Sequence, residues 1–174
     1  MRSRLGAITN EEVARMSALI LNRLRSDEWL PAHTTVALFG GIKGEPDLLP
    51  LIPWLLERQS TPVFFGFKGG LLIPQRIENS EQLERGIFDV WIPVAEAPVV
   101  PCEQLDVILT PGLAFGRDGM RLGRGRGHYD RLLGLSEMHA RRIGVCWEFQ
   151  HVEAVPTEPH DVPMHAVVTE RDTR

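Results

Sequence analysis

Glycine and arginine alternate within one short segment of the chain. Gly123, Gly125 and Gly127 are separated by Arg124 and Arg126. Glycine allows a ligand to approach the backbone closely and tolerates positive φ, so successive N–H groups can surround an anion. Arginine side chains donate charge-assisted, often bidentate hydrogen bonds to phosphate oxygens. These residue types in this spacing therefore indicate a polyphosphate-binding loop.

Charged residues flank the glycine–arginine segment on both sides. Arg121 precedes it, and Asp130 and Arg131 follow it. The arginines can add positive charge at a polyphosphate. Asp130 offers a hard oxygen ligand for Mg²⁺, which commonly takes one or two carboxylates together with phosphate oxygens. Glycine, arginine and one acid are the groups that a triphosphate with its metal requires, so we expect ATP and Mg²⁺ at this segment.

The segment matches neither of the common nucleotide motifs. Its glycines lack dinucleotide-fold spacing and do not directly follow a strand, and no lysine follows them as in a Walker A loop. A flexible arginine–glycine loop that touches RNA is the alternative interpretation. The formal net charge of −4 opposes a nucleic-acid binder that acts through its overall field. Tyr129, the only tyrosine of the chain, favours a binding site over a disordered tail.

The elements around the segment place it at the edge of a sheet. Residues 105–109 form the clearest predicted strand, because the last three of them are continuously apolar between turn signals. A helix is predicted at residues 129–135. The long loop between them begins near Pro111 and follows the carboxyl end of a strand, where open α/β sheets bind their ligands. Loops of this length in compact domains are usually functional or disordered.

Local patterns predict the remaining helices and strands. Thr9 and Glu12 form a capping-box pattern, and apolar residues at helical spacing then predict a helix of about 16 residues. A second helix is predicted at residues 47–59, with Pro50 and Pro53 in its first turns. Further strands are predicted at residues 34–39, 62–67, 71–77, 142–147 and 166–169.

The order of these elements indicates the fold class. Strands that alternate with helical patterns indicate βαβ units and a largely parallel sheet. The chain of 174 residues has the size of one ordinary domain, and no linker or internal repeat divides it. We therefore expect an α/β fold in which residues 1–174 form a single-domain three-layer sandwich with a largely parallel sheet.

The composition indicates where the protein works. Hydrophobic residues make up 43% and charged residues 24%, as in soluble globular proteins. No apolar run approaches the roughly 18 residues that a membrane-spanning helix needs, and the N-terminus is too polar for a secretory signal. Cys102 and Cys146 lack metal-ligand spacing. We expect a cytoplasmic protein, a monomer or weak dimer, without membrane or nucleic-acid partners.

Three blocks of the sequence form a recognisable pattern: residues 111–115 (PGLAF) with 119–131 (GMRLGRGRGHYDR), then Gln150 with residues 155–156 (VP), 159–163 (PHDVP) and 168–170 (VTE), and finally residues 44–47 (GEPD). These blocks resemble the 5-formyltetrahydrofolate cyclo-ligases, also called methenyltetrahydrofolate synthetases. The first is the most specific and the third is the weakest. The resemblance covers almost the whole chain from Thr9 onward, and the blocks occur in the family's order.

The resemblance implies an ATP-dependent ring closure on a reduced folate. The γ-phosphoryl group of ATP passes to the formyl oxygen of 5-formyltetrahydrofolate. The folate's N10 then attacks the activated carbon, and loss of phosphate leaves 5,10-methenyltetrahydrofolate, with ADP as the other product. Such chemistry asks the protein mainly for positioning and charge stabilisation. No catalytic residue is assigned beyond the binding groups.

The resemblance also implies the ligands of individual residues. Asp130 and Asp161 fall at the family's magnesium positions. Glu45 falls at a folate-contacting position, and Gly40 at a strand end that lines the same pocket. His128 stands where the family usually has an aromatic residue, so ring stacking is favoured there over acid–base work. The residues implied to bind ATP are Arg121, Leu122, Gly123, Arg124, Gly125, Arg126, Gly127, His128 and Tyr129; those implied to face the folate as well are Arg124, Gly125, Arg126, Gly127 and His128.

Two departures from the family pattern leave other functions open. The family has a Lys/Arg-rich segment before the first helix that reaches the ATP, whereas residues 1–8 contain no lysine and offer only Arg2 and Arg4. The dipeptide at residues 92–93 (IP) replaces the usual acidic-Pro pair. The alternatives are a non-catalytic family member that binds nucleotide or folate, and an RNA-binding module. Catalysed appearance of methenyl absorbance with ATP separates the cyclo-ligase from both.

Overall fold

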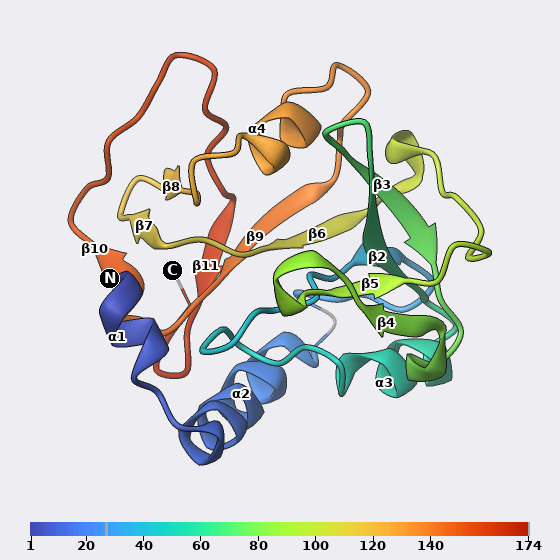
Figure 1. The fold of residues 1–174 in the computed structure, drawn as a ribbon, viewed down its shortest axis with the longest axis horizontal. Coiled ribbons are helices and arrows are strands. Elements are labelled where there is room, and N and C mark those ends of the chain that lie inside the picture. Colours follow the sequence, from blue (N-terminus) through green and yellow to red (C-terminus); the bar gives the residue numbers. More distant parts are fainter. Residues whose placement is uncertain (27, 174) are drawn as a thin grey trace.

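The computed structural model describes residues 1–26 and 28–173 and is built around one large sheet (Figure 1). All neighbouring strands of this sheet pair in parallel except the last two, which form an antiparallel hairpin. The largely parallel sheet expected from the sequence is therefore confirmed. In spatial order its six strands are β11 (Ala166–Val168), β9 (Arg141–Val145), β6 (Val107–Thr110), β1 (Thr35–Ala37), β2 (Thr61–Lys68) and β3 (Leu71–Arg76).

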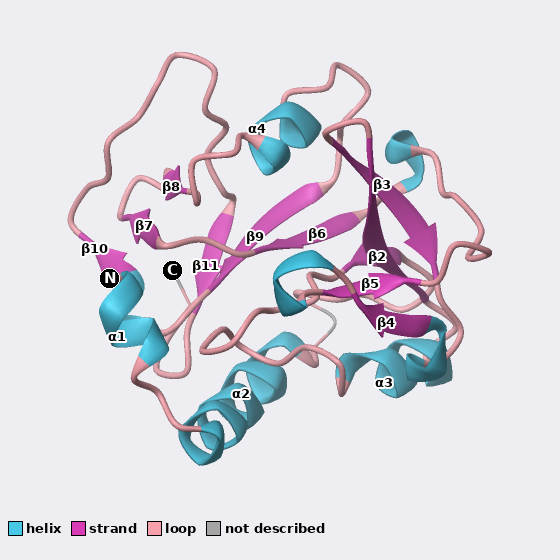
Figure 2. Ribbon diagram, in the orientation of Figure 1, coloured by secondary structure: helices cyan, strands magenta, loops and turns pink. Residues whose placement is uncertain are grey.

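Helices cover both faces of the sheet: α2 (Asn10–Leu24) and α3 (Leu51–Glu57) lie on one face, and α4 (His128–Leu133) lies on the other (Figure 2). One apolar core contains Leu24 of α2 and Leu55 of α3, and a second contains Leu132 of α4. This arrangement is the expected three-layer sandwich. A short helix, α1 (Arg2–Gly6), precedes α2. Within the described residues no helix is both long and apolar enough to cross a membrane.

Helix α2 begins where the capping-box pattern predicts. Oγ1 of Thr9 accepts the Glu12 N–H at 3.2 Å, and Oε2 of Glu12 accepts the Thr9 N–H at 2.9 Å. The hydrogen bonds that the Thr9 N–H and, next, the Thr9 hydroxyl donate to Oε2 of Glu12 lower the pKa of this carboxyl, because they favour its charged form. The helix has 15 residues, against about 16 predicted.

The observed ends of the other helices and strands differ by a few residues from the predicted ends. All six predicted strands are present, with their ends displaced by at most two residues. The helix predicted at residues 47–59 is wrong at its start, because it occupies only Leu51–Glu57. Oδ1 of Asp47 accepts the Leu49 N–H at 3.0 Å in a turn, and Pro50 is the N-cap. The helix predicted at residues 129–135 begins and ends slightly earlier, at His128–Leu133.

Several short elements escape the sequence patterns, since strands of two or three residues are too short to show a period. The long loop after β6 is in part a small sheet with the order β10-β7-β8, and a separate hairpin pairs β4 with β5. The additional strands are β4 (Leu83–Arg85), β5 (Trp91–Pro93), β7 (Ala114–Gly116), β8 (Arg121–Leu122) and β10 (His151–Val152). Single 3-10 turns are η1 (Ser80–Gln82), η2 (Ile87–Asp89), η3 (Cys102–Gln104) and η4 (Glu148–Gln150).

Candidate functional site

Arg121 joins the two ends of the glycine–arginine loop. It lies on β8, and its side chain is only 5% exposed. Its Nη2 donates to Oδ1 of Asp130 on α4, and its Nη1 donates to the Pro111 carbonyl at 3.4 Å. The guanidinium carbon also lies 5.5 Å from the centre of the Tyr129 ring. These contacts fix the start of the loop against its end.

Glu45 and Arg124 form an ion pair between two distant segments. Nε and Nη2 of Arg124 both donate to Oε1 of Glu45, at 3.2 and 2.6 Å. The other carboxylate oxygen, Oε2, accepts the Ile42 N–H at 3.1 Å. The side chain of Glu45 is 7% exposed and that of Arg124 is 36% exposed. A residue implied to contact the folate and one implied to contact ATP therefore touch each other.

The turn that carries Glu45 packs against α1. Gly44 has a φ of +86°, and a Cβ at this position would lie 2.2 Å from the Leu5 carbonyl oxygen. Arg2 of α1 extends toward the glycine–arginine loop, where its Nη2 donates to the Arg124 carbonyl at 3.5 Å. Helix α1 therefore contacts both halves of the candidate site.

Gly40 permits a close approach between two backbones. A Cβ at this position, just after β1, would lie 1.9 Å from the Trp91 carbonyl oxygen. The Gly40 carbonyl accepts the Trp91 N–H at 2.9 Å. The backbone of β5 therefore lies directly against the end of β1. Packing explains glycine at this position, and its part in lining a folate pocket stays a prediction.

The base of the glycine–arginine loop is part of the small sheet. The Leu122 carbonyl accepts the Leu113 N–H at 2.7 Å. A Cβ at Gly123 would lie 2.9 Å from Nη1 of Arg121, so the glycine leaves room for that guanidinium. This part of the loop is shaped by contacts within the protein.

The tip of the loop, by contrast, is open. Gly125 and Arg126 are both exposed. Gly125 has a φ of +84° and Gly127 a φ of +64°, a region that favours glycine. Apart from Gly125 and its two chain neighbours, no atom of the described residues lies within 4 Å of the place where a Cβ of Gly125 would stand. The backbone conformation therefore requires glycine here, and a ligand can reach this part of the loop.

His128 and Arg131 connect the end of the loop to the β2–β3 hairpin. Nη2 of Arg131 lies 2.8 Å from Nδ1 of His128 and 3.0 Å from the Gly70 carbonyl oxygen. Nδ1 of His128 also lies 3.2 Å from the same carbonyl oxygen, so this nitrogen accepts from the guanidinium in one tautomer of the ring and donates to the carbonyl in the other. The ring meets Phe67 edge to face, with centroids 4.7 Å apart. Within the protein, the ring contact at His128 is thus made by a hairpin residue that the sequence did not single out.

Tyr129 lies close enough to both ion pairs to feel the charges of Arg121 and Glu45. Burial, the largest effect, raises the pKa of its phenol, while the Arg121 guanidinium opposes the rise and Glu45 adds to it. The ring also meets Phe65 edge to face, with centroids 5.8 Å apart. The hydroxyl therefore stays protonated at neutral pH and can donate a hydrogen bond.

The two candidate magnesium ligands lie on different segments and are both already engaged. Asp130, on α4, accepts from Arg121. Asp161, between β10 and β11, accepts the Glu158 N–H through Oδ2 at 2.8 Å, and its side chain is 17% exposed. Within residues 1–26 and 28–173 no group of three or more His, Cys, Asp or Glu side chains is placed to hold a metal. A carboxylate with phosphate oxygens is the donor set that fits Mg²⁺ here.

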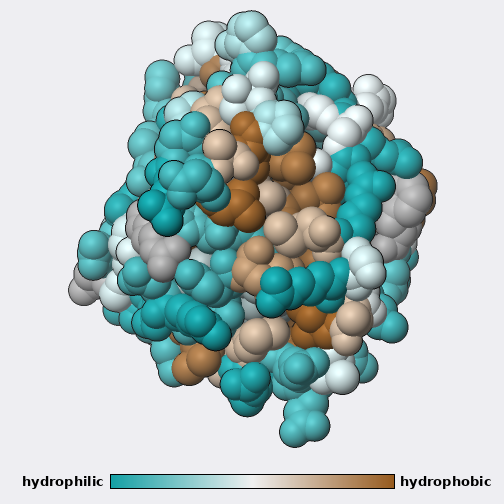
Figure 3. Space-filling view, turned by 90° about the vertical axis from the view of Figure 1, so that its left-hand side faces the viewer, coloured by the Kyte–Doolittle hydropathy of each residue, from teal (hydrophilic) through white to brown (hydrophobic). Residues whose placement is uncertain are grey.

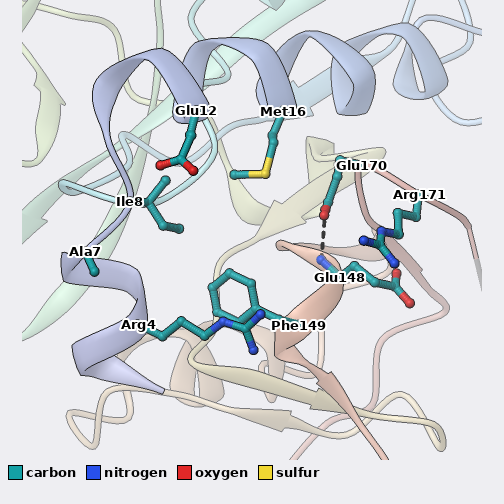
Figure 4. A pocket seen from close by; sticks show the side chains of 9 residues that line it. All are labelled: Arg4, Ala7, Ile8, Glu12, Met16, Glu148, Phe149, Glu170 and Arg171. Carbon is teal, nitrogen blue, oxygen red and sulfur yellow. Dashed lines mark hydrogen bonds between the residues drawn. The ribbon is translucent and has the colours of Figure 1, made fainter.

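A pocket of about 470 Å³ opens beside α1, at a place that the sequence did not indicate. Figure 4 shows Arg4 and Phe149 at its edge, with the Arg4 guanidinium 4.1 Å from the centre of the Phe149 ring. Apolar side chains also gather in a hollow on the left-hand face of the molecule, within a hydrophilic rim (Figure 3). The pocket is lined by Arg4, Ala7, Ile8, Glu12, Met16, Glu148, Phe149, Glu170 and Arg171.

Comparisons with known proteins identify a family, related sequences and related structures. A family model described as the 5-formyltetrahydrofolate cyclo-ligase family matches residues 1–170. The 5-formyltetrahydrofolate cyclo-ligase of Escherichia coli K12 is 33% identical, over 97% of this chain and 96% of its own length. The NMR structure of Aquifex aeolicus 5,10-methenyltetrahydrofolate synthetase matches with a TM-score of 0.83 and 32% identity, covering 99% of this chain and 87% of that one. A synthetase from Mycoplasma pneumoniae shares the fold, with a TM-score of 0.76 and 23% identity, covering 97% and 93% of the two chains.

Proposed function

Since the chain belongs to the 5-formyltetrahydrofolate cyclo-ligase family, we propose that it converts 5-formyltetrahydrofolate to 5,10-methenyltetrahydrofolate. ATP is the co-substrate, and ADP and inorganic phosphate are released. We further propose that residues 1–174 act as a single domain in the cytoplasm, as a monomer or weak dimer. The net charge of −4 opposes nucleic acid as a partner, and we propose ATP and a reduced folate as the partners.

The contact between Arg124 and Glu45 carries the proposal. It brings a glycine–arginine loop within 2.6 Å of a carboxylate that is only 7% exposed. The loop suits phosphate oxygens, and the carboxylate suits the N–H groups of a reduced pterin. The reaction needs the two ligands side by side, because the γ-phosphorus must reach the formyl oxygen of the folate.

Phosphoryl transfer is the first step. We assign the triphosphate to the backbone N–H groups of residues 123–127 and to Arg126, which stands exposed at the tip of the loop. The γ-phosphorus bonds to the formyl oxygen while its bond to the bridging oxygen of ADP breaks. Charge that develops on the transferring group is stabilised by arginine at the loop.

Ring closure is the second step. N10 of the folate attacks the formyl carbon and loses its proton, and the bond from that carbon to the phosphorylated oxygen breaks. Inorganic phosphate leaves with the former formyl oxygen. We assign the folate to Glu45, His128 and the strand end at Gly40, next to the same loop. The protein promotes this attack by holding N10 close to the formyl carbon in a rigid site.

We propose Asp130 and Asp161 as the protein ligands of a magnesium ion that accompanies ATP. When bound, such an ion neutralises charge on the phosphate oxygens. Asp130 already faces Arg121, so the guanidinium and a metal would compete for its Oδ1. A phosphate group beside the loop supplies the further oxygen ligands that two carboxylates lack.

The function is tested by the appearance of methenyl absorbance when the purified chain meets ATP, Mg²⁺ and 5-formyltetrahydrofolate. Arg126→Ala should lower kcat/KM for ATP by about 10- to 100-fold, because a charge-assisted contact to phosphate contributes roughly 1.5–3 kcal/mol. Arg15→Ala, which removes an exposed arginine of α2, serves as the matched control and should change it by less than about twofold. Nucleotide binding without product would identify a non-catalytic family member, and equal losses at the two positions would move the site elsewhere.

The metal assignment is tested by Asp130→Asn. The amide keeps an oxygen for Arg121 but loses the charge that attracts Mg²⁺, so half-maximal activity should need more magnesium. Asp118→Asn is the control, since Oδ1 of Asp118 accepts the Met120 N–H at 3.1 Å and an amide oxygen can do the same. Activity is measured against magnesium concentration for both variants. Superimposable curves for Asp130→Asn and the unaltered protein would place the metal away from Asp130.

A further inference from the structure

The Glu45 carboxylate is neutralised by a side chain of the phosphate-binding loop. Two donors of Arg124 converge on one oxygen of Glu45, at 2.6 and 3.2 Å, and the carboxylate is almost fully buried. A buried carboxylate that loses its partner is strongly destabilised. Arg124, which is 36% exposed, can instead turn toward solvent or a ligand without that penalty. The pair therefore persists mainly because the buried Glu45 carboxylate requires a hydrogen-bond donor.

The same pair opposes nucleotide binding. Glu45 places a negative charge within 2.6 Å of a guanidinium that the proposed function assigns to phosphate. A carboxylate and a polyphosphate compete for the charge and for the hydrogen-bond donors of one arginine. With Glu45 unliganded, a triphosphate must either share Arg124 with this carboxylate or leave the carboxylate buried and unpaired.

A reduced pterin removes this competition. Its N–H groups can donate to Glu45 and so replace the hydrogen bonds that Arg124 supplies. Arg124 is then released to the phosphates while Glu45 stays paired. We propose that the Glu45–Arg124 pair couples the two ligands, so that each tightens the binding of the other. The coupling rests on the proposed function, because it requires folate at Glu45 and phosphate at Arg124.

The coupling must be reciprocal and must depend on the charge of Glu45. An interaction free energy between two ligands changes both affinities by the same factor, commonly at least about fivefold. Glu45→Gln keeps an amide oxygen for the Ile42 N–H but removes the charge that holds Arg124. In this variant Arg124 is available before any folate arrives, so the nucleotide alone should bind more tightly. A residue that serves only as a folate contact would leave nucleotide affinity unchanged.

The experiment measures the Kd of a non-hydrolysable ATP analogue with Mg²⁺ by calorimetry, with and without saturating tetrahydrofolate. Tetrahydrofolate carries no formyl group, so no turnover occurs. In the unaltered protein it should lower the Kd of the analogue by at least about fivefold. In Glu45→Gln the Kd without folate should already be lower by a similar factor, and tetrahydrofolate should change it no further. Asp47→Asn, which removes an exposed charge two residues away, should behave as the unaltered protein does.

The outcomes separate this inference from the proposed function. An unaltered protein that forms the methenyl product, but whose Glu45→Gln variant binds the analogue no more tightly, retains the function and overturns the coupling. A protein that binds neither ligand fails both. If Glu45→Gln melts below the assay temperature, Arg124→Gln carries the test. In that variant tetrahydrofolate must leave the Kd of the analogue unchanged, and persistent tightening overturns the coupling.

Discussion

Two arginines three positions apart on the same loop each pair with a carboxylate, yet the two pairs are built differently. Arg121 reaches Asp130, nine residues along the chain, and the arginine is the more buried partner, 5% exposed against 23%. Arg124 reaches Glu45, 79 residues away, and the carboxylate is the more buried partner, 7% exposed against 36%. The first pair closes the loop on itself, and the second connects the loop to another segment.

The buried partner decides what each pair can do. Arg121 cannot leave its place without losing a carbonyl, a carboxylate and the face of Tyr129, so it holds the loop in shape. Arg124 can leave, provided that another donor satisfies Glu45. Identical side chains on one loop thus divide into a fixed support and an exchangeable contact. A direct contact of Arg121 with ATP stays a prediction, and its burial favours positioning.

The largest expected effect tests whether Arg121 holds the loop in shape. Arg121→Ala should lower the free energy of unfolding by about 3 kcal/mol, because it leaves the partly buried Asp130 carboxylate without its partner. Arg117→Ala is the matched control on the neighbouring turn, since Arg117 pairs with Glu153 at 71% and 80% exposure. That variant should lose less than about 1 kcal/mol. Urea denaturation measures both. Similar losses would remove the distinction between a supporting and a surface arginine.

A second, smaller effect tests how the Glu45 segment is held. Gly44 and Gly70 share nearly the same positive φ, +86° and +83°, but only Gly44 has a close neighbour, the Leu5 carbonyl oxygen at 2.2 Å from a built Cβ. Gly70→Ala should therefore lose about 1 kcal/mol of stability through backbone strain alone. Gly44→Ala should lose about 2 kcal/mol and should expose α1 to limited proteolysis, because the helix must move away. Equal stability with an intact α1 would contradict the packing described.

The smallest expected effect is a pH dependence of the folding stability, which arises from the Tyr129 phenol near the two ion pairs. Burial raises the pKa of this phenol above its ordinary value of 10, so the folded chain keeps a proton that the unfolded chain releases. The stability from this phenol is complete below pH 10 and is lost as the pH rises above it, by less than about 1 kcal/mol at pH 10.5. Tyr129→Phe should remove that loss.

A single chromophore makes the measurement direct. Because Tyr129 is the only tyrosine, tyrosinate absorbance reports this residue alone. The folded chain should show none at pH 10.5, while the chain in denaturant should titrate at the ordinary pKa. Tyrosinate in the folded chain at that pH would mean that the Tyr129 phenol is not buried near the two pairs.

Local sequence patterns determined much of the secondary structure. The helix start at Thr9 was predictable because a capping box needs only residues three positions apart. The six strands of the large sheet were predictable because buried strands are short apolar runs between turn residues. The loop at residues 121–130 stood out by composition alone, since alternating glycine and arginine is unusual in any helix or strand. The family resemblance named its ligands and Glu45, and the matches to known proteins support the family.

The tertiary structure alone decided which of these residues meet. The order of the sheet sets β1 beside β6, and so brings the segment after β1 to the loop that follows β6. No local period encodes the resulting contact of Glu45 with Arg124, and none encodes the partners of Gly44 or His128. The short strand β7 pairs with β8 and with β10, which lies far along the chain, so its place also depends on a distant segment. Sequence patterns act over a few residues, whereas contacts between distant segments depend on how the whole chain packs.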